Sequence, residues 1–349
     1  MDFDFNEDQR LLQQALRDFL AGECPPAWVR AQWETDTGRD GPFWKRLAEV
    51  GVPGLLVPED QGGLGMDETD LALLLEETGR AGLAEPVVAT SVGVALLREL
   101  SGDLAAEWLP KVASGDARLA VGHAGSPFVA DAHVADLLFL ANEGALHAVP
   151  AAQVRVEAQP SVDGAQRLFL VGFDVGEPVA EGDLAQALLD AALDRGAFCS
   201  AAEALGVADR LIELAVEYAT QREQFGVAIG SFQAVKHMLA DVKVELEYAR
   251  SHVYRAAHSV ATAAPTRAVD VSMAKLAACD VANAAAKISL QVHGAIGYTY
   301  EQDVHVWMKR AWSLDLAYGD SVFHRGRLCA GVIDQTIPAS AFGYQPLNS

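Results

Sequence analysis

Apolar residues recur at the three- and four-residue spacing of an amphipathic helix in the first third of the chain. They include Phe5, Leu11, Leu12, Ala15, Leu16 and Phe19, and later Leu71, Leu74 and Leu75. This spacing puts them on one face of a helix, so we predict helices within residues 1–116. Asp67 stands directly before the second run and is a predicted N-cap. The glycines and prolines of 51–65 predict a turn-rich link between the helices.

The pattern changes to short β-like runs between residues 117 and 182. Turn residues separate these runs, which lie at 119–121, 135–140, 145–149 and 167–171. Strands this short predict a small β module. After residue 183 the pattern is helical and rich in alanine, with breaks near 222–231, 263–266, 294–302 and 336–338. We therefore predict a mainly α fold with an N-terminal helical domain (1–116), a shortened middle β domain (117–182) and a C-terminal helical bundle (183–349).

Composition and charge narrow the classes of partner. Hydrophobic residues make up 51% of the 349, which implies a large buried core. No apolar run reaches the roughly 20 residues of a bilayer span, and the acidic first twenty residues do not read as a secretion signal, so we expect a cytoplasmic protein. The net charge of −22 repels phosphate backbones and argues against a nucleic-acid partner. The four widely spaced cysteines predict neither a disulfide nor a metal site.

Two segments of the C-terminal half contain the most specific chemistry. The first reads R-E-Q-F-G-V-A-I-G-S-F-Q over 222–233. Arg222 at a helix end would offer a planar fork of donors to a pyrophosphate. Gly226 permits a tight turn, and a following helix capped by Ser231 would direct its first N–H groups and Gln233 toward a polar ligand. The alternative is a helix–loop–helix corner with a surface arginine.

The second segment reads Q-V-H-G-A-I-G-Y over 291–298, where glycines would let the backbone approach a ligand closely. The two segments resemble the R-x-Q-F-G-x-x-I-x-x-F-Q and Q-x-x-G-G-x-G-[FY] signatures of the acyl-CoA dehydrogenase family. The stretch from Trp44 to Arg80 resembles the same family. Ala295 replaces the family's second glycine and adds one methyl group near the ligand.

The resemblance implies an N-terminal helical domain, a middle β domain and a C-terminal four-helix bundle. It also implies the chemistry, in which a carboxylate removes the α proton of an acyl-CoA while the β hydrogen leaves as hydride to FAD. FAD would lie across a dimer contact, with its ring on one chain and its pyrophosphate and adenosine on the next. The residues that the resemblance assigns to this distal half are Arg222, Gln224, Phe225, Phe232, Gln233, Gln291, His293, Gly294, Ala295 and Ser321.

The sequence first departs from the family pattern in the part of the site that holds the flavin ring. The β module is much shorter than a family middle domain and lacks the T-E-P…G-S-D and W-I-T-N segments that line the ring. The nearest stretch is G-H-A-G-S-P over 122–127. His123 in this stretch is a candidate ring contact, with a surface or hydrogen-bonded position as the alternative. We therefore expect another chain to supply the ring pocket.

The sequence departs from the family pattern a second time at the position of the catalytic base. The family usually takes it from the Glu of a Y-E-G-T turn, and here Tyr318 aligns while Gly319 occupies the position of the base. Glycine cannot accept a proton. Asp320, one residue away, is a candidate whose expected role is instead to cap the helix 321–328. Asp194, near the earlier helix position that some members use, is one methylene shorter than Glu.

These observations predict a subunit of a heteromeric, FAD-dependent acyl-CoA dehydrogenase. It resembles the short chains that pair with a full-length partner, two of each, in bacterial steroid side-chain degradation. The partner would supply the flavin-ring pocket and the base, and the substrate would be an acyl-CoA thioester. Two alternatives stay open: a homo-oligomeric enzyme with an unconventional base acting on an unusual thioester, and a homologue that binds no flavin. Lys309 and Arg310 are expected on a solvated helix face or at a subunit contact.

Overall fold

Helices make up most of the described chain. The computed structural model describes residues 4–123, 126–334 and 336–343. The N-terminal helices are α1 (Glu7–Glu23), α2 (Pro26–Trp33), α3 (Gly41–Glu49), α4 (Glu68–Ala81), α5 (Val87–Leu100) and α6 (Gly102–Ala113). The predicted N-cap of α4 is confirmed, because the Asp67 carboxylate accepts a hydrogen bond from Thr69 N at 2.7 Å.

The β module consists of two small sheets. Its strands are β1 (Leu119–Val121), β2 (Val129–Ala130), β3 (Leu137–Asn142), β4 (Ala145–Pro150), β5 (Val154–Gln159), β6 (Leu168–Phe173) and β7 (Ala180–Glu181). One sheet has the strand order β1-β3-β4-β7 and the other β2-β6-β5. β1 and β3 are parallel, with Leu119 opposite Leu137, and the other pairs in the two sheets are antiparallel. Side chains from both sheets, among them Leu138 and Phe169, form a small shared core.

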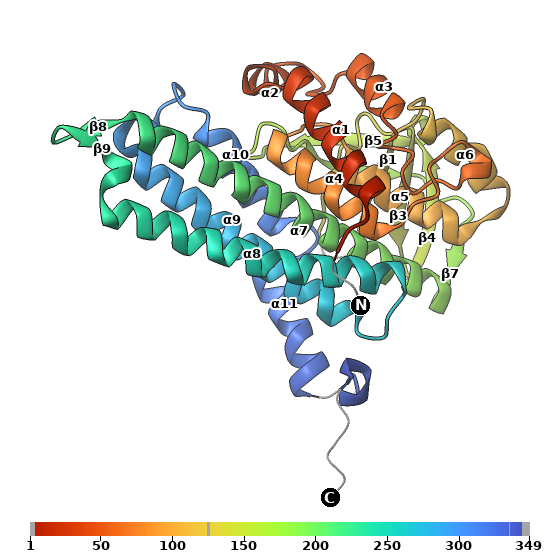
Figure 1. Cartoon of the computed structure of the whole chain (residues 1–349). Helices are drawn as coiled ribbons and strands as arrows, with labels where there is room; N and C mark the ends of the chain where they lie inside the picture. The colour runs from red at the N-terminus through yellow and green to blue at the C-terminus, as the bar shows by residue number, and fades with distance from the viewer. Residues whose placement is uncertain (1–3, 124–125, 335, 344–349) are drawn as a thin grey trace, which may run out of the picture.

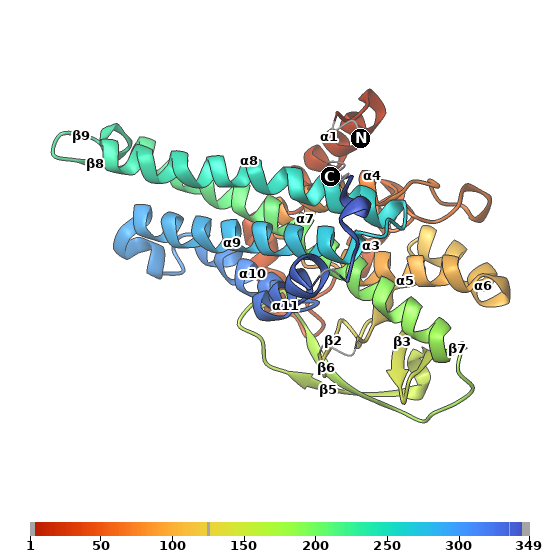
Figure 2. The ribbon, with the colours of Figure 1, turned by 90° about the horizontal axis from the view of Figure 1, so that it is seen from below.

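The C-terminal part is a bundle of long helices. They are α7 (Gly182–Gln221), α8 (Gln233–Ala261), α9 (Arg267–His293), α10 (Val304–Leu316) and α11 (Ser321–Leu328). α7, α8 and α9 pack along one another toward the hairpin of β8 (Glu223–Gln224) and β9 (Val227–Ala228) (Figure 1). The strands of the β module lie on one side of this bundle and α8 on the opposite side (Figure 2). The predicted mainly α fold with a small β module is confirmed.

Shorter 3-10 and π turns connect several of these elements. They are η1 (Glu59–Gln61), η2 (Ala151–Gln153), η3 (Ile229–Ser231), η4 (Gly294–Tyr298), η5 (Cys329–Ile333) and η6 (Ala339–Phe342). η3 and η4 follow the hairpin and α9, so both lie in the segments that the sequence singled out for cofactor binding.

Two glycine contacts bring α4 and α7 close together. A Cβ atom on Gly79 would lie 2.0 Å from the carbonyl oxygen of Glu203, and one on Gly206 would lie 1.8 Å from that of Glu76. Because no side chain fits at such distances, the crossing requires glycine at both positions. The crossing sets Glu203 beside Thr78, whose hydroxyl donates to Glu203 Oε1 at 3.0 Å. A buried carboxyl is thereby held where the two helices meet.

Three properties of the described residues bear on possible functions. None of their helices combines the length and the apolar character needed to cross a bilayer. Within the same residues, no three His, Cys, Asp or Glu side chains gather where they could hold a metal ion. Cys24, Cys199, Cys279 and Cys329 are free thiols.

Candidate functional site

The ends of α7 and α9 and the β8–β9 hairpin enclose an open cleft, which we call the distal cleft. Its volume is about 440 Å³, and it is lined by Tyr218, Arg222, Gln224, Ile229, Val292, His293, Gly294, Ala295 and Ile296. Half of the residues predicted to bind the cofactor therefore lie together, and they come from two separate segments of the chain.

The hairpin beside the distal cleft is built on a two-residue turn. Phe225 and Gly226 have positive φ values of 55° and 80°, the type I′ geometry that matches the twist of a tight hairpin. Gln224 pairs with Val227 across the turn. The Phe225 side chain is 94% exposed. The motif residues Phe225 and Gly226 thus form a projecting tip, with an aromatic ring in solvent.

Arg222 follows the last residue of α7, and its backbone N–H donates to Tyr218 O at 2.8 Å. Its exposed guanidinium makes no hydrogen bond or ion pair with any described residue. On the other wall of the cleft His293 stacks on the Tyr218 ring at 4.4 Å, and its Nδ1 lies 2.8 Å from Ser289 O. Burial lowers the pKa of His293, so its ring is uncharged near neutral pH. The cleft therefore combines an uncommitted guanidinium with a fixed neutral imidazole.

The other predicted cofactor residues do not line the distal cleft. Phe225 and Phe232 make an edge contact at the hairpin tip, with ring centroids 6.2 Å apart. Gln233 begins α8, and Gln291 is exposed on the last turn of α9. Ser321 begins α11, which packs on α9; within α11, His324 contacts Ser272 near the end of α9 away from the cleft.

Ser231 does not cap α8, contrary to the prediction from the sequence. Its hydroxyl donates to Ala228 O at 2.7 Å, within the turn that precedes the helix. α8 begins at Gln233 after Phe232, and no side chain caps it. The serine satisfies a carbonyl of η3, so the first N–H groups of α8 receive no bond from its hydroxyl.

The turn between α10 and α11 contains the position where a base was expected. Tyr318 and Gly319 have positive φ values of 55° and 101°. The Asp320 carboxylate accepts a hydrogen bond from Phe323 N at 2.8 Å and caps α11, as predicted. A carboxylate in this capping contact is aimed at the helix end.

Asp194, the other carboxylate that the sequence suggested, is fully engaged in ion pairs. It is buried, and it accepts hydrogen bonds from Arg267 Nε at 2.7 Å and from Arg327 Nη2 at 2.6 Å. Its contacts tie α7 to α9 and α11. This pairing gives Asp194 a structural role.

Two buried side chains hold the turn between α10 and α11 in place. The Lys275 ammonium donates to the carbonyl oxygens of Leu314 at 2.6 Å and Asp315 at 3.0 Å, at the C-terminal end of α10. Nε2 of His324 lies 3.1 Å from Tyr318 O. Burial lowers the pKa of His324 to about 4, so the imidazole is neutral at physiological pH.

A second hollow, the inner cavity, lies between the β module and the bundle. Its volume is about 380 Å³, and it is lined by Val121, His123, Ser126, Pro127, Phe128, Ala130, Pro160, Ser161, Val162, Gln166, Leu168, Ser313, Leu316, Ala317 and Tyr318. The predicted stretch 122–127 therefore borders it, although residues 124 and 125 lie outside the described residues. His123 stacks on Tyr318 at 4.9 Å, and burial lowers its pKa.

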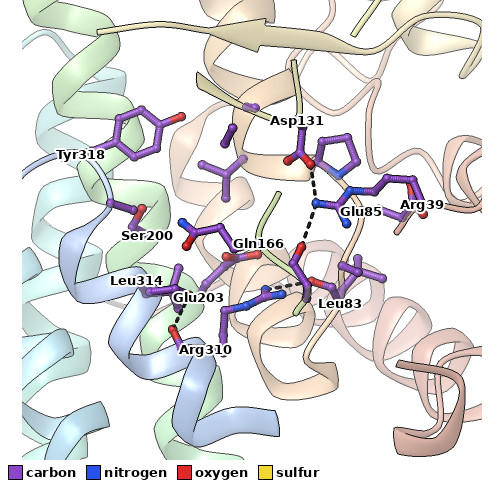
Figure 3. Close-up of a pocket in the computed structure, with 18 residues that line it drawn as sticks. Arg39, Leu83, Glu85, Asp131, Gln166, Ser200, Glu203, Arg310, Leu314 and Tyr318 are labelled. Carbon is purple, nitrogen blue, oxygen red and sulfur yellow. Dashed lines mark hydrogen bonds and ion pairs between the residues drawn. The ribbon is translucent and has the colours of Figure 1, made fainter. Parts of the chain in front are cut away.

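A narrower hollow of about 90 Å³, the recess, adjoins the inner cavity (Figure 3). It is lined by Arg39, Leu83, Ala84, Glu85, Pro86, Val88, Ala89, Ala130, Asp131, Ala165, Gln166, Ser200, Glu203, Arg310, Ser313, Leu314, Ala317 and Tyr318. Five residues line both hollows: Ala130, Gln166, Ser313, Ala317 and Tyr318. The two hollows therefore have a common wall that includes the ring of Tyr318.

The arginines of the recess have carboxylate partners. Arg39 pairs with Asp131 and donates to Ala165 O at 2.8 Å. Arg310 donates from Nε to Asp163 at 2.7 Å. The sequence prediction for Arg310 was wrong: it is 7% exposed and lies in the interior. A partner 147 positions away in the sequence satisfies its charge.

Glu203 differs from the other acids of the recess because no described cation forms an ion pair with it. It is 6% exposed, and its Oε1 accepts a hydrogen bond from the Thr78 hydroxyl. Burial raises its pKa, although the nearby Arg310 charge and the Thr78 hydroxyl oppose this. Sequence reasoning overlooked this residue. The available signal was one acidic residue within an otherwise small and apolar run, 196–208.

The chain matches acyl-CoA dehydrogenases over both of its helical parts. Residues 6–116 match the acyl-CoA dehydrogenase N-terminal domain, and residues 187–333 match the C-terminal domain. Acyl-CoA dehydrogenase IpdE2 of Mycobacterium tuberculosis is 35% identical over 309 residues, which cover 87% of this chain and 91% of that protein.

Solved structures have the same fold. One chain of the ChsE4-ChsE5 complex from Mycobacterium tuberculosis superposes with a TM-score of 0.85 at 25% identity, covering 97% of this chain and 100% of that one. A chain of a Tcur3481-Tcur3483 steroid ACAD variant has a TM-score of 0.85 at 24% identity, covering 94% and 98%. With both domain matches and a relative of 35% identity, this chain belongs to the acyl-CoA dehydrogenase family.

Proposed function

We propose that this chain is one subunit of a heteromeric, FAD-dependent acyl-CoA dehydrogenase that desaturates the α,β bond of an acyl-CoA thioester. Its distal cleft would hold the pyrophosphate and adenosine half of FAD, whose ring would rest on a full-length partner subunit. FAD supplies the acceptor for the hydride when it is bound. The observation that carries the proposal is the uncommitted guanidinium of Arg222 on an open cleft, in a chain whose expected base position is Gly319.

The residues of the distal cleft fit an anionic cofactor. Arg222 has no carboxylate partner among the described residues, although carboxylates are abundant in this chain of net charge −22. A guanidinium fork matches two phosphate oxygens, and Gln224 adds amide hydrogen bonding on the same wall. At Gly294 the φ of 63° ends α9, and no atom lies within 4 Å of the place where a Cβ would be. This leaves room for a ligand against the backbone.

Proton abstraction is assigned to the partner in this proposal. Asp320 caps α11 and Asp194 is bound by two arginines. Neither carboxylate is free to approach a substrate carbon, and a general base needs direct hydrogen-bond reach. The base and the flavin-ring pocket would therefore come from the full-length chain, in an assembly of two of each.

The comparisons support a mixed assembly. The ChsE4-ChsE5 structure is a complex of two kinds of chain, one of which resembles this chain at 25% identity. Exposed apolar side chains such as Leu316, Val322 and Ile333, each more than 70% exposed, would be covered in an oligomer. We include a steroid-derived acyl group among the candidate substrates.

Co-expression with candidate full-length acyl-CoA dehydrogenases of the same organism tests the proposal. We expect the chain alone to be colourless, and the co-purified pair to show a flavin spectrum and dehydrogenase activity. Mutation of the partner's base should abolish turnover and leave FAD bound. A yellow, active preparation of the chain alone would instead support the homo-oligomeric alternative. A colourless co-purified pair would support the homologue that binds no flavin.

A further inference from the structure

A hollow of about 280 Å³, which we call the arginine pocket, lies where the N-terminal helices meet the bundle. Its walls come from the end of α1, the start of α2, the end of α4, the middle of α7 and Trp307 on α10. The exposed residues Ala21 and Pro25 form part of its rim. None of its lining residues lines the distal cleft, the inner cavity or the recess. The arginine pocket is therefore separate from the sites described above.

The charged side chains that line the arginine pocket are mostly cationic. Three of them are arginines, Arg17, Arg80 and Arg210, and one is a carboxylate, Glu77. Both oxygens of Glu77 already accept hydrogen bonds. Oε1 is bound by Arg17 Nη2 at 2.7 Å and Gln13 Nε2 at 2.8 Å, and Oε2 is bound by Arg17 Nε at 2.9 Å. The lining thus has an excess of positive charge, in a chain whose net charge is −22.

The carboxylate partners of Arg80 and Arg210 lie outside the arginine pocket. Arg80 donates from Nη1 to Asp209 at 2.9 Å and pairs with Glu213 through Nη2. Arg210 donates from Nη1 to Glu213 at 3.2 Å. Asp209 and Glu213 line a neighbouring groove along α7, and the two arginines line both hollows. The guanidinium groups therefore stand between these carboxylates and the arginine pocket.

Each of the three arginines keeps N–H groups that no described residue accepts. They are on Nη1 of Arg17, Nε of Arg80, and Nε and Nη2 of Arg210. The Arg210 guanidinium also lies over the ring of Trp307, with its central carbon 5.5 Å from the ring centroid. Ion pairs and this stacking already order the side chains, so an anion that binds here immobilises few additional rotamers.

The remaining lining and the surrounding charges indicate the class of anion. Leu20, Pro26 and Trp307 give the pocket an apolar wall, and its volume suits a ligand smaller than a typical drug. A carboxylate matches the donor fork of a guanidinium. Asp209 and Glu213 lie directly behind the arginines, and their repulsion opposes a second negative charge on the ligand. These features favour a singly charged carboxylate over a phosphate dianion.

We propose that the arginine pocket binds a small monocarboxylate, with the carboxylate on the open N–H groups of the three arginines and a compact apolar part against α1 and α2. The site lies outside the distal cleft, so it does not depend on FAD or on the function proposed above. Its walls belong to the N-terminal helices and to the bundle. A bound carboxylate therefore joins these two parts of the chain and stabilises the folded state.

Titration of the full-length chain with simple anions tests the selectivity. Benzoate, cyclohexanecarboxylate and butyrate are the carboxylate probes. Benzamide is the neutral isostere of benzoate, benzylammonium is a cation of similar size, and inorganic phosphate is the dianion. Isothermal titration calorimetry near neutral pH should detect binding of at least one carboxylate, with the other three probes at least about tenfold weaker. Equal affinity for benzoate and benzamide, tighter binding of phosphate, or no binding of any carboxylate would overturn the proposal.

Two variants locate the bound carboxylate. Arg210→Gln should lower the affinity by about tenfold or more, through loss of hydrogen bonds to a charged group. Its control is Arg155→Gln, at an exposed arginine on β5. Ala21→Trp fills the rim of the pocket without changing any charge and should abolish binding. Its control is Ala15→Trp, at an exposed alanine of α1 that does not line the pocket.

The two variants act by different means, so they check each other. If Arg210→Gln folds poorly, Ala21→Trp still decides, because its side chain lies on the exposed rim. Weaker binding in the pocket variants with both controls unchanged assigns the carboxylate to the arginine pocket. Unchanged affinity in Ala21→Trp, or an equal loss in Ala15→Trp, would place the bound carboxylate elsewhere and refute the site.

Discussion

The ring of Tyr318 lies directly against the backbone of Gly196 on α7. A Cβ atom built on Gly196 would be 2.1 Å from both Cδ1 and Cε1 of the ring. Tyr318 reaches this place from a left-handed backbone conformation with φ 55°, and its ring also stacks on His123 at 4.9 Å. The glycine therefore lets an aromatic ring fill the space between the bundle and the β module, on the wall common to the inner cavity and the recess.

Gly196→Ala should destabilise the chain by about 1–3 kcal/mol, the typical cost of forcing extra atoms into a packed site. The added methyl must push the tyrosine ring away from α7. Gly22→Ala is the matched control, because α1 has nothing within 4 Å of that position, and alanine there should be neutral or stabilising by up to about 1 kcal/mol. Chemical denaturation measures both changes.

A double variant checks that the clash with Tyr318 is the cause. In a Tyr318→Ala background, Gly196→Ala should cost much less, so the two changes should couple by at least about 0.5 kcal/mol. Equal costs of Gly196→Ala in both backgrounds would place the strain elsewhere on α7.

Arg222→Ala should weaken FAD retention in the co-expressed enzyme by about 1.5–3 kcal/mol, the range for hydrogen bonds to charged groups. Arg222→Lys should restore only part of it, because an ammonium cannot form the paired contacts of a guanidinium fork. Flavin absorbance per protein after dialysis measures the loss. Arg155→Ala is the control, since Arg155 is an exposed arginine on β5, away from the cleft. Full FAD content in Arg222→Ala would make Arg222 a simple helix-end residue.

Asp320→Asn should keep most of the activity of the assembled enzyme, because the amide oxygen can still accept the bond from Phe323 N. Asp320→Ala should lower stability by about 0.5–2 kcal/mol through loss of the cap. Steady-state rates and thermal unfolding separate the two effects. A fall in turnover by about two to four orders of magnitude in Asp320→Asn, with the flavin spectrum intact, would make Asp320 the base after all.

The positions of the helices and of several strands could be predicted from local patterns. Helical spacing, the Asp67 cap and the β-like runs at 119–121 and 145–149 are properties of neighbouring residues, and the structure has these elements. The two motifs at 222–233 and 291–298 could also be recognised, because each lies in one continuous segment of the sequence. β5 was missed because its side chains are mostly exposed and include charged ones.

Features that depend on distant partners could not be predicted. Arg310 looked like a surface residue because its partner Asp163 lies 147 positions away in the sequence. The recess is built from the N-terminal helices, the β module and the bundle, so no single segment reveals it. Ser231 has the residue type of a cap, but α8 begins two residues later at Gln233, and the hydroxyl donates to Ala228 O. The residue type alone therefore did not predict which hydrogen bond this hydroxyl makes.

Glu203 should make the stability of the chain depend on pH in a predictable direction. Burial raises its pKa in the folded state, so folding favours the protonated carboxyl. The stability that this preference contributes is complete below the unfolded value of about 4.5. It is lost as the pH rises from there through the folded-state pKa, by up to roughly 1.4 kcal/mol per pH unit within that window.

Glu203→Gln removes this dependence, because the amide has the shape of the protonated acid and cannot ionise. The variant can still accept the Thr78 hydrogen bond at its Oε1. Its stability relative to the unmodified chain should therefore rise as the pH increases above about 4.5, until the folded-state pKa of Glu203 is passed. Other groups that titrate in this range, such as His324, are the same in both proteins and cancel in the difference. Urea unfolding at several pH values measures it, with Glu245→Gln on the exposed side of α8 as the control. A difference that stays constant with pH, or that falls, would mean that Glu203 is ionised at little cost in the folded chain. The recess would then contain a carboxylate and not a neutral carboxyl group.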